Sequence, residues 1–215
     1  MNAHAPQPGA PGILLHAPRI YDLQVWLVSH GRESRLRDTM LNLARLAPGE
    51  AMLDVGCGTG TLAIAARARL GPAGEVVGLD ASPEMIASAR GKARRAGVPV
   101  DFETGPAQAL PFPDDRFDLA TCTLMLHHLP RPGREVCLRE IRRVLKPGGR
   151  ALIVDFATSS TQQGGLLHRL HRHGRVKPAD ILDLVVRAGL RPIEDGSLPL
   201  RDLYYVLAVA PEATA

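Results

Sequence analysis

The sequence has few cysteines, little net charge and no long hydrophobic run, and each shortage excludes a class of protein. Its 215 residues include three cysteines, none in a CxxC pair, which excludes a disulfide framework and a zinc ribbon and predicts a reducing, cytoplasmic setting. Lys and Arg number 26 against 22 Asp and Glu, so a nucleic-acid partner is not indicated. No apolar run approaches the ~18 to 20 residues that span a bilayer. The chain is therefore predicted not to cross a membrane.

The first 18 residues also lack Lys and Arg, and they contain four prolines. This composition does not match a signal peptide, so we predict a flexible segment over 1–18 and a single domain over 19–215. With 45% hydrophobic and 22% charged residues, that domain has the composition to bury a sizeable core.

Apolar spacings of three and four residues predict helices, and short apolar runs between them predict strands. The part over 19–47 is predicted to be helical with a break near Gly31, and 156–178 is predicted to be a loop or lid over a ligand. Because apolar strands alternate with amphipathic helices, we expect an α/β fold whose parallel sheet is covered on both faces. The predicted strands are 51–55, 75–79, 100–103, 117–122, 151–155, 191–194 and 203–209, and the predicted helices between them are 59–70, 83–96, 134–145 and 178–188.

A glycine-rich stretch, LDVGCGTG over 53–60, lies where the first predicted strand meets a helix. Its glycines let the backbone approach a ligand, and the helix N-terminus offers free N–H groups. The spacing is GxGxG, which matches neither the GxGxxG dinucleotide fingerprint nor a Walker loop. Asp80 ends the second strand 20 residues after Gly60, where an acid can accept both hydroxyls of a ribose. Together they suggest a nucleoside ligand, although Asp54 as a helix cap and Asp80 as an ordinary strand-end acid remain alternatives.

Five ordered motifs carry a resemblance to a known family: 53–60, VGLDASPEM over 77–85, LPFPD over 110–114, Phe117-Asp118, and VLKPGG over 144–149. They resemble the class I S-adenosylmethionine-dependent methyltransferases, in the group that includes the ubiquinone and menaquinone C-methyltransferases. The match covers roughly 20–155. The resemblance implies a Rossmann-like three-layer sandwich with a mostly parallel seven-stranded sheet and an antiparallel C-terminal strand.

The resemblance also implies a cofactor, S-adenosylmethionine, and residues that bind it. Asp80 would hold the ribose, and Tyr21 would belong to a flap that closes over the cofactor. The methionine part would contact the glycine loop and the end of the fourth strand, and the adenine would lie between two turns. The implied loop and strand-end residues are Asp54, Gly56, Cys57, Gly58, Thr59, Gly60, Thr123 and Leu124, and the implied adenine neighbours are Ala81, Met85, Pro106, Ala107 and Gln108.

Pro106 departs from the family pattern, which usually has an Asp there to accept the adenine amino group. Proline offers neither a carboxylate nor an N–H. The Ala107 N–H and the Gln108 carboxamide remain as substitutes, so we expect cofactor binding to be weakened by ~0.5 to 1.5 kcal/mol but not abolished.

His127 and His128 follow the fourth predicted strand, at the edge where α/β proteins bind ligands, so either is a candidate general base. No metal site is predicted, because His168, His171 and His173 have no carboxylate or thiolate nearby. The predicted activity is methyl transfer to a small-molecule acceptor. The alternatives are a quinone or lipid methyltransferase with transient membrane-surface contact through the basic segment 168–177, a non-catalytic cofactor-binding protein, and a nicotinamide-dependent oxidoreductase. The acceptor and the oligomeric state do not follow from the sequence.

Overall fold

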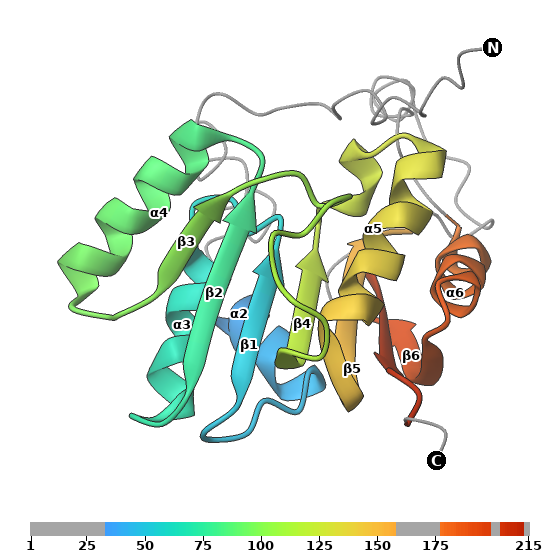
Figure 1. Ribbon diagram of the computed structural model, residues 1–215, viewed down its shortest axis with the longest axis horizontal. Helices are drawn as coiled ribbons and strands as arrows, with labels where there is room; N and C mark the ends of the chain where they lie inside the picture. Colours follow the sequence, from blue (N-terminus) through green and yellow to red (C-terminus); the bar gives the residue numbers. More distant parts are fainter. Residues whose placement is uncertain (1–32, 158–176, 199–202, 213–215) are drawn as a thin grey trace, which may run out of the picture.

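The computed structural model describes residues 33–157, 177–198 and 203–212 (Figure 1). The predicted flexible segment 1–18, the flap residue Tyr21 and nearly all of the predicted lid lie outside these residues. Of the predicted N-terminal helices, the structure describes α2 (Glu33–Leu43).

Seven strands form one sheet in the order β3-β2-β1-β4-β5-β7-β6 (Figure 1). All pairs are parallel except those made by β7, which runs antiparallel to both of its neighbours, as the resemblance implied. The chain moves outward from β1 to β3 and then returns to place β4 on the other side of β1, so the strand order reverses between β1 and β4. In open α/β sheets, ligands bind at such a reversal, outside the carboxyl ends of the strands. The strands are β1 (Ala51–Val55), β2 (Glu75–Asp80), β3 (Asp101–Thr104), β4 (Phe117–Thr123), β5 (Leu145–Phe156), β6 (Arg191–Ser197) and β7 (Leu203–Val209).

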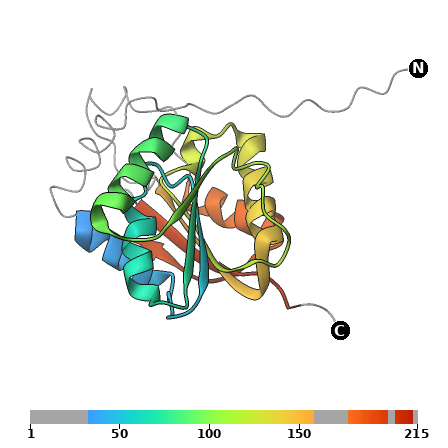
Figure 2. The ribbon, with the colours of Figure 1, turned by 60° about the vertical axis from the view of Figure 1, so that its left-hand side comes forward.

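Helices cover both faces of the sheet and give it a core on each side (Figure 2). One core joins the sheet to α2, α3 (Thr61–Leu70) and α4 (Pro83–Ala96), and the other joins it to α5 (Arg131–Val144) and α6 (Pro178–Arg187). Because both faces are covered, β1 and the centre of β5 are apolar along most of their length, which is the pattern that predicted a parallel sheet.

The α4 helix begins and ends at residues that the sequence signals predict. Ser82 is its N-cap, and its hydroxyl accepts a hydrogen bond from the Met85 N–H (3.2 Å). Pro83 occupies the first turn, and Gly97 ends the helix in the left-handed region with φ of 65°. This cap lies two residues after Asp80, so the helix begins close to the end of β2.

The segment Lys146-Pro147-Gly148-Gly149 lies between the predicted helix 134–145 and the predicted strand 151–155, but the structure includes it in β5. The helix ends at Val144, and β5 already begins at Leu145, which pairs with Phe117. The register then moves to Leu119 opposite Arg150, so the four residues bulge out of the strand. The bulge requires glycine at position 149, because a Cβ there would lie only 2.8 Å from the Lys146 carbonyl oxygen.

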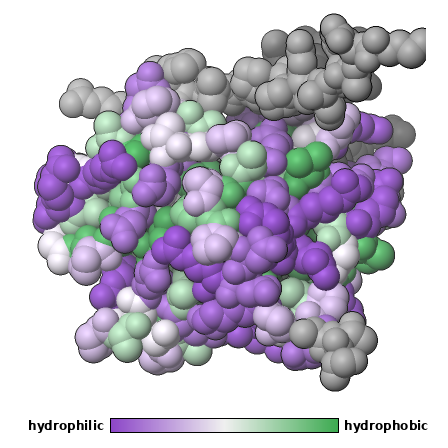
Figure 3. All heavy atoms as spheres, viewed as in Figure 1, coloured by the Kyte–Doolittle hydropathy of each residue, from purple (hydrophilic) through white to green (hydrophobic). Residues whose placement is uncertain are grey.

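The surface seen in Figure 3 is largely hydrophilic, with apolar side chains in small separate areas. Among the described residues, the exposed large apolar side chains are Val136, Val186 and Ile193. None of the described helices combines the length and the apolar character that a membrane span requires.

Candidate active site

The loop between β1 and α3 has a backbone that needs glycine. Gly56, Gly58 and Gly60 have φ angles of 72°, 53° and 77°, in the left-handed region. The Gly56 and Cys57 N–H groups both donate to the Leu79 carbonyl (2.8 and 3.0 Å), which holds the loop against the end of β2. A Cβ on Gly56 would lie 2.3 Å from the Met125 Cγ. The glycine therefore lets the loop and the segment after β4 meet above the reversal of strand order.

Asp80 lies at the carboxyl end of β2, beside this loop. Its Oδ2 accepts the Gly58 N–H and its Oδ1 accepts the Ser82 N–H, each at 2.9 Å. A carboxylate has about four lone-pair positions, so these hydrogen bonds leave room for a further donor, such as a ribose hydroxyl. Burial raises the pKa of Asp80, while the backbone N–H groups at Ser82, Gly58 and Ala81 oppose that shift.

Asp54, at the end of β1, is a buried acid with 1% of its surface exposed. The Thr121 hydroxyl donates to its Oδ1 (2.7 Å), and the Ala63 backbone in the first turn of α3 also bonds to it. Burial raises the pKa of Asp54 to about 6, and the nearby charge of Asp80 contributes in the same direction. Asp54 therefore caps α3 through its bond to Ala63, as the alternative interpretation predicted. It also links β1 to β4 through its bond to Thr121.

These two carboxylates and the glycine loop fit S-adenosylmethionine. Asp54 and Asp80 repel one another, and both are partly withdrawn from water, so a ligand that carries positive charge would lower their free energy. S-adenosylmethionine carries a sulfonium and an ammonium group, which would supply such a charge. Its carboxylate would face the N–H groups at the start of α3.

Cys57 lies in the same loop, with its Sγ packed toward Gly78 and the core that joins the sheet to α2, α3 and α4. Burial raises the pKa of the Cys57 thiol well above its usual range, and the charges of Asp54 and Asp80 add to this. The thiol stays neutral, which agrees with a small residue that fills the loop and not with a nucleophile.

The two turns predicted to surround the adenine lie at the same edge of the sheet. The Gly105 N–H donates to the Asp80 carbonyl (3.0 Å), which brings the 105–108 turn next to the end of β2. Ala81 and Pro106 are exposed, Gln108 is half-buried, and Ala107 and Met85 are buried. The Gln108 amide faces the start of α5, because its Nε2 would lie 3.2 Å from a Cβ on Gly133.

Thr123 is the last residue of β4 and Leu124 follows it, and both are half-buried. Leu124 has φ of 55°, a strained conformation for a bulky residue, and its N–H donates to the Val154 carbonyl (2.7 Å). Strained residues concentrate at functional sites, and this one turns the chain from β4 toward the two histidines.

His127 and His128 lie in the short helix η1 (Leu126–His128), with ring centroids 4.0 Å apart. The His127 Nδ1 lies 2.7 Å from the Asp155 Oδ1 at the end of β5, and the His127 backbone N–H donates to the Asp155 Oδ2 (2.9 Å). Burial lowers the pKa of His128 to about 4, and the charge of His127 adds to this effect. His127 therefore has a carboxylate partner, whereas no carboxylate of the described residues forms a hydrogen bond with His128.

Asp155 and Thr121 are the polar residues that sequence reasoning did not select. Both are fully buried in strands next to the site. A signal for Asp155 exists, since it is an acid at the carboxyl end of a predicted apolar strand, the same position as Asp54 and Asp80. Nothing in the sequence marks Thr121.

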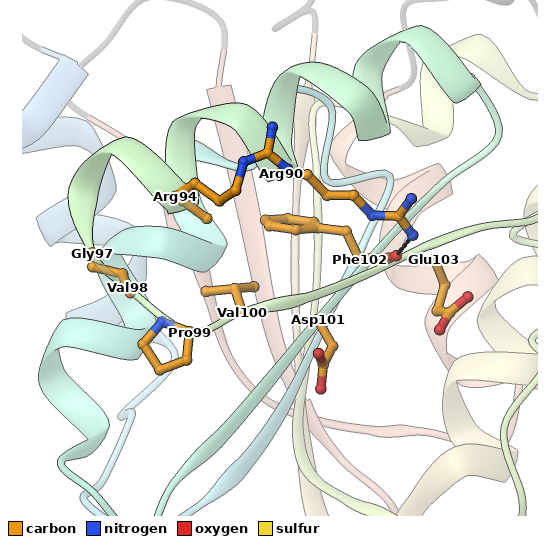
Figure 4. Close-up of a pocket in the computed structure, with 10 residues that line it drawn as sticks. Arg90, Arg94, Gly97, Val98, Pro99, Val100, Asp101, Phe102 and Glu103 are labelled. Atoms are coloured by element: carbon orange, nitrogen blue, oxygen red, sulfur yellow. Dashed lines mark hydrogen bonds between the residues drawn. The ribbon is translucent and has the colours of Figure 1, made fainter.

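A cavity of about 550 Å³ lies elsewhere, between the C-terminal half of α4 and the edge strand β3 (Figure 4). Arg90, Arg94 and Phe102 line it, and the Arg90 guanidinium donates to the Phe102 carbonyl. None of the residues predicted to bind the cofactor lines this cavity. Within the described ranges, no three His, Cys, Asp or Glu side chains are arranged to hold a metal ion.

Comparisons with known proteins point to the same class of enzyme as the sequence motifs. A family model described as a methyltransferase domain matches residues 52–149. The chain is 39% identical over 155 residues to demethylmenaquinone methyltransferase of Thermus thermophilus. The aligned region covers 72% of this chain and 69% of that enzyme. It is 39% identical over 146 residues to the ubiquinone/menaquinone biosynthesis C-methyltransferase of Geobacter sulfurreducens, but it spans only 55% of that enzyme's length. A structure described as a SAM-dependent methyltransferase from Aquifex aeolicus superposes with a TM-score of 0.69 at 23% identity, covering 81% of this chain and 89% of that one, which concerns the fold alone.

Proposed function

Because this chain belongs to the family of S-adenosylmethionine-dependent methyltransferases, we propose that it transfers the methyl group of that cofactor to a ring carbon of a small hydroquinone. The relatives named above act on demethylmenaquinone or in ubiquinone and menaquinone biosynthesis, which supports a quinone-type acceptor. The chain spans only 55% of the length of the Geobacter enzyme, so its acceptor does not follow from family membership and is proposed separately.

The observation that carries the proposal is the pair of carboxylates, Asp54 and Asp80, at neighbouring strand ends beside the glycine loop. We assign Asp80 to the ribose, the Gly56–Gly60 loop to the methionine part, and the 105–108 turn to the adenine. Bound S-adenosylmethionine supplies a methyl group on a sulfonium, and the sulfur keeps the electron pair of the broken bond. The chain contributes position and exclusion of water, a proximity effect that amounts to ~7 to 11 kcal/mol in favourable cases.

The reduced acceptor is the form that this chemistry requires. A sulfonium methyl group is an electrophile and needs an electron-rich carbon. A hydroquinone ring is electron-rich once a hydroxyl is deprotonated, whereas a quinone ring is electron-poor. A base at the site therefore has a purpose, and His127 is the candidate that the contacts favour, since its ring is held by a carboxylate.

Membrane-surface contact was the sequence-based alternative, and it depended on the basic segment 168–177. Of that segment only Lys177 lies within the described residues.

The test uses a 1,4-naphthohydroquinone with a short prenyl chain on one ring carbon and a free position on the next. With S-adenosylmethionine, we expect mass spectrometry and NMR to show one new methyl group on carbon. The oxidised quinone is the matched control and should give no product. Methylation of oxygen, or equal turnover of the quinone and the hydroquinone, would contradict the proposal. Cofactor binding by calorimetry without any transfer would favour the non-catalytic alternative.

A further inference from the structure

Asp155 is a fully buried carboxylate at the carboxyl end of β5, with 0% of its surface exposed. Two backbone N–H groups and one imidazole nitrogen point at it. The His127 backbone N–H donates to Oδ2 (2.9 Å), the His127 Nδ1 lies 2.7 Å from Oδ1, and the Phe156 N–H donates to Oδ1 (2.7 Å). Backbone N–H groups can only donate, so the carboxyl group is an acceptor on both oxygens.

This arrangement selects one form of the neutral His127 ring. With an acceptor 2.7 Å away, the Nδ1 carries the proton, and the Nε2 keeps a free lone pair. The ring is also held between His128, at a centroid distance of 4.0 Å, and Phe156, at 5.3 Å in an edge-on geometry. Its orientation is therefore determined by a hydrogen bond and by packing on two sides.

The position of the ring relative to the cofactor loop follows from the sheet. β4 and β5 are parallel neighbours, so η1 and Asp155 lie at the same edge as Asp54 and Asp80. Met125, two residues before His127, approaches Gly56 so closely that the glycine has no room for a Cβ. The segment that carries His127 thus touches the loop assigned to the methionine part.

We propose that Asp155 is a positioning residue that keeps the proton on the His127 Nδ1, so that the Nε2 takes the hydroxyl proton of the acceptor. This inference rests on the proposed function. In the step, the O–H bond breaks, its electron pair stays on the acceptor oxygen, and the proton forms an N–H bond at the Nε2. The resulting imidazolium is stabilised by the Asp155 carboxylate, and the acceptor becomes an aryloxide whose ring carbon is nucleophilic.

A purely structural role makes a different prediction. The bond from the His127 backbone N–H to Oδ2 ties η1 to β5, and that bond needs only an acceptor. Asp155→Asn can retain it through the carboxamide oxygen, while the Phe156 N–H loses its acceptor at Oδ1. The carboxamide NH2 then faces the His127 ring and favours an unprotonated Nδ1, which moves the ring proton to Nε2.

The test compares Asp155→Asn with the wild type, using the prenylated naphthohydroquinone as acceptor. We expect kcat to fall about 10²-fold or more, while KM for S-adenosylmethionine changes less than about threefold. Asp118→Asn is the matched control. Asp118 also accepts one backbone N–H, from Ala51 (2.9 Å), and one side-chain donor, Lys146 (2.7 Å), but at the opposite edge of the sheet. Its kcat should stay within about threefold of the wild type.

A second measurement does not depend on how the variant folds. In ¹⁵N-histidine-labelled wild-type protein with S-adenosylhomocysteine, the neutral His127 should show a protonated Nδ1 and an unprotonated Nε2. A protonated Nε2 in the wild type would overturn the inference, as would full kcat in Asp155→Asn. If the wild type binds the cofactor but methylates no hydroquinone, the proposed function fails instead, so the two failures are distinguishable.

Discussion

The ionisation of Asp54 affects both the stability of the fold and the binding of a ligand at this site. Its carboxyl group is buried next to Asp80, and burial raises its pKa to about 6 from the usual 3.8. The folded protein therefore holds this proton more tightly than the unfolded chain does. The resulting contribution to stability is complete below pH 3.8 and is lost as the pH rises through about 6. A shift of this size corresponds to about 3 kcal/mol.

Asp54→Asn tests both effects. Asparagine stays neutral, so above about pH 6 the variant should be more stable than the wild type by about 1 to 3 kcal/mol, less whatever hydrogen bonding to Thr121 it loses. Its affinity for S-adenosylmethionine should fall, because one of the two carboxylates is gone. Urea unfolding at about pH 4.5 and about pH 7.5 measures the first effect, and calorimetry measures the second. A stability difference that is the same at both pH values would contradict the assignment of the shift to Asp54.

The element that places Asp54 beside Asp80 is the β1-loop-α3 unit. Gly60 is the N-cap of α3 with φ of 77°, and a Cβ there would lie 2.7 Å from the Phe102 Cζ and 2.8 Å from the Ala89 Cβ. The glycine loop is thus tight on the side of α4 and β3 and faces the ligand on the other. Its shape depends on packing from two later elements as well as on its own glycines.

Gly60→Ala should destabilise the fold through both effects. The left-handed backbone costs about 1 kcal/mol or slightly more for a residue with a Cβ, and the contact with Phe102 and Ala89 adds about 1 to 3 kcal/mol. Gly97→Ala is the matched control, since Gly97 has φ of 65° but nothing within 4 Å of a Cβ. It should lose about 1 kcal/mol only. Equal losses in the two variants, measured by urea unfolding, would show that the close packing behind the loop is not what requires glycine.

At the scale of the whole molecule, the site is an edge of the sheet to which β1, β2, β4 and β5 each contribute a residue. A ligand at this edge contacts both halves of the sheet across the reversal between β1 and β4. Binding should therefore stabilise the whole fold and not one segment, because only the folded state brings these strand ends together.

S-adenosylhomocysteine should accordingly raise the melting temperature. At about one hundred times its dissociation constant, the gain is about 2.7 kcal/mol, or roughly 5 to 10 °C for a chain of this size. Asp80→Ala should remove most of the shift at the same ligand concentration, because the ribose loses two charge-assisted hydrogen bonds. The control is again Asp118→Asn, which should lower the melting temperature of the free protein but keep the ligand-induced shift. An undiminished shift in Asp80→Ala would exclude this carboxylate from the site.

The sequence determined the features that depend on neighbours within one strand-loop-helix unit. The glycine loop, Asp80 at the next strand end, the Ser82 cap and the alternation of strands and helices are all local patterns, because turns, caps and periodicity depend on residues a few positions apart. These patterns sufficed for the family, the cofactor and the fold class.

Which distant residues meet depends on the tertiary structure and not on local sequence patterns. Thr121 reaches Asp54 across 67 residues, and His127 meets Asp155 across 28, because the sheet places β4 between β1 and β5. The bulge that carries Gly148 and Gly149 within β5 likewise depends on the pairing with β4. Spacing along a chain does not encode strand order. The pair of histidines was therefore equivalent in the sequence, and a buried carboxylate from another strand distinguishes His127 from His128.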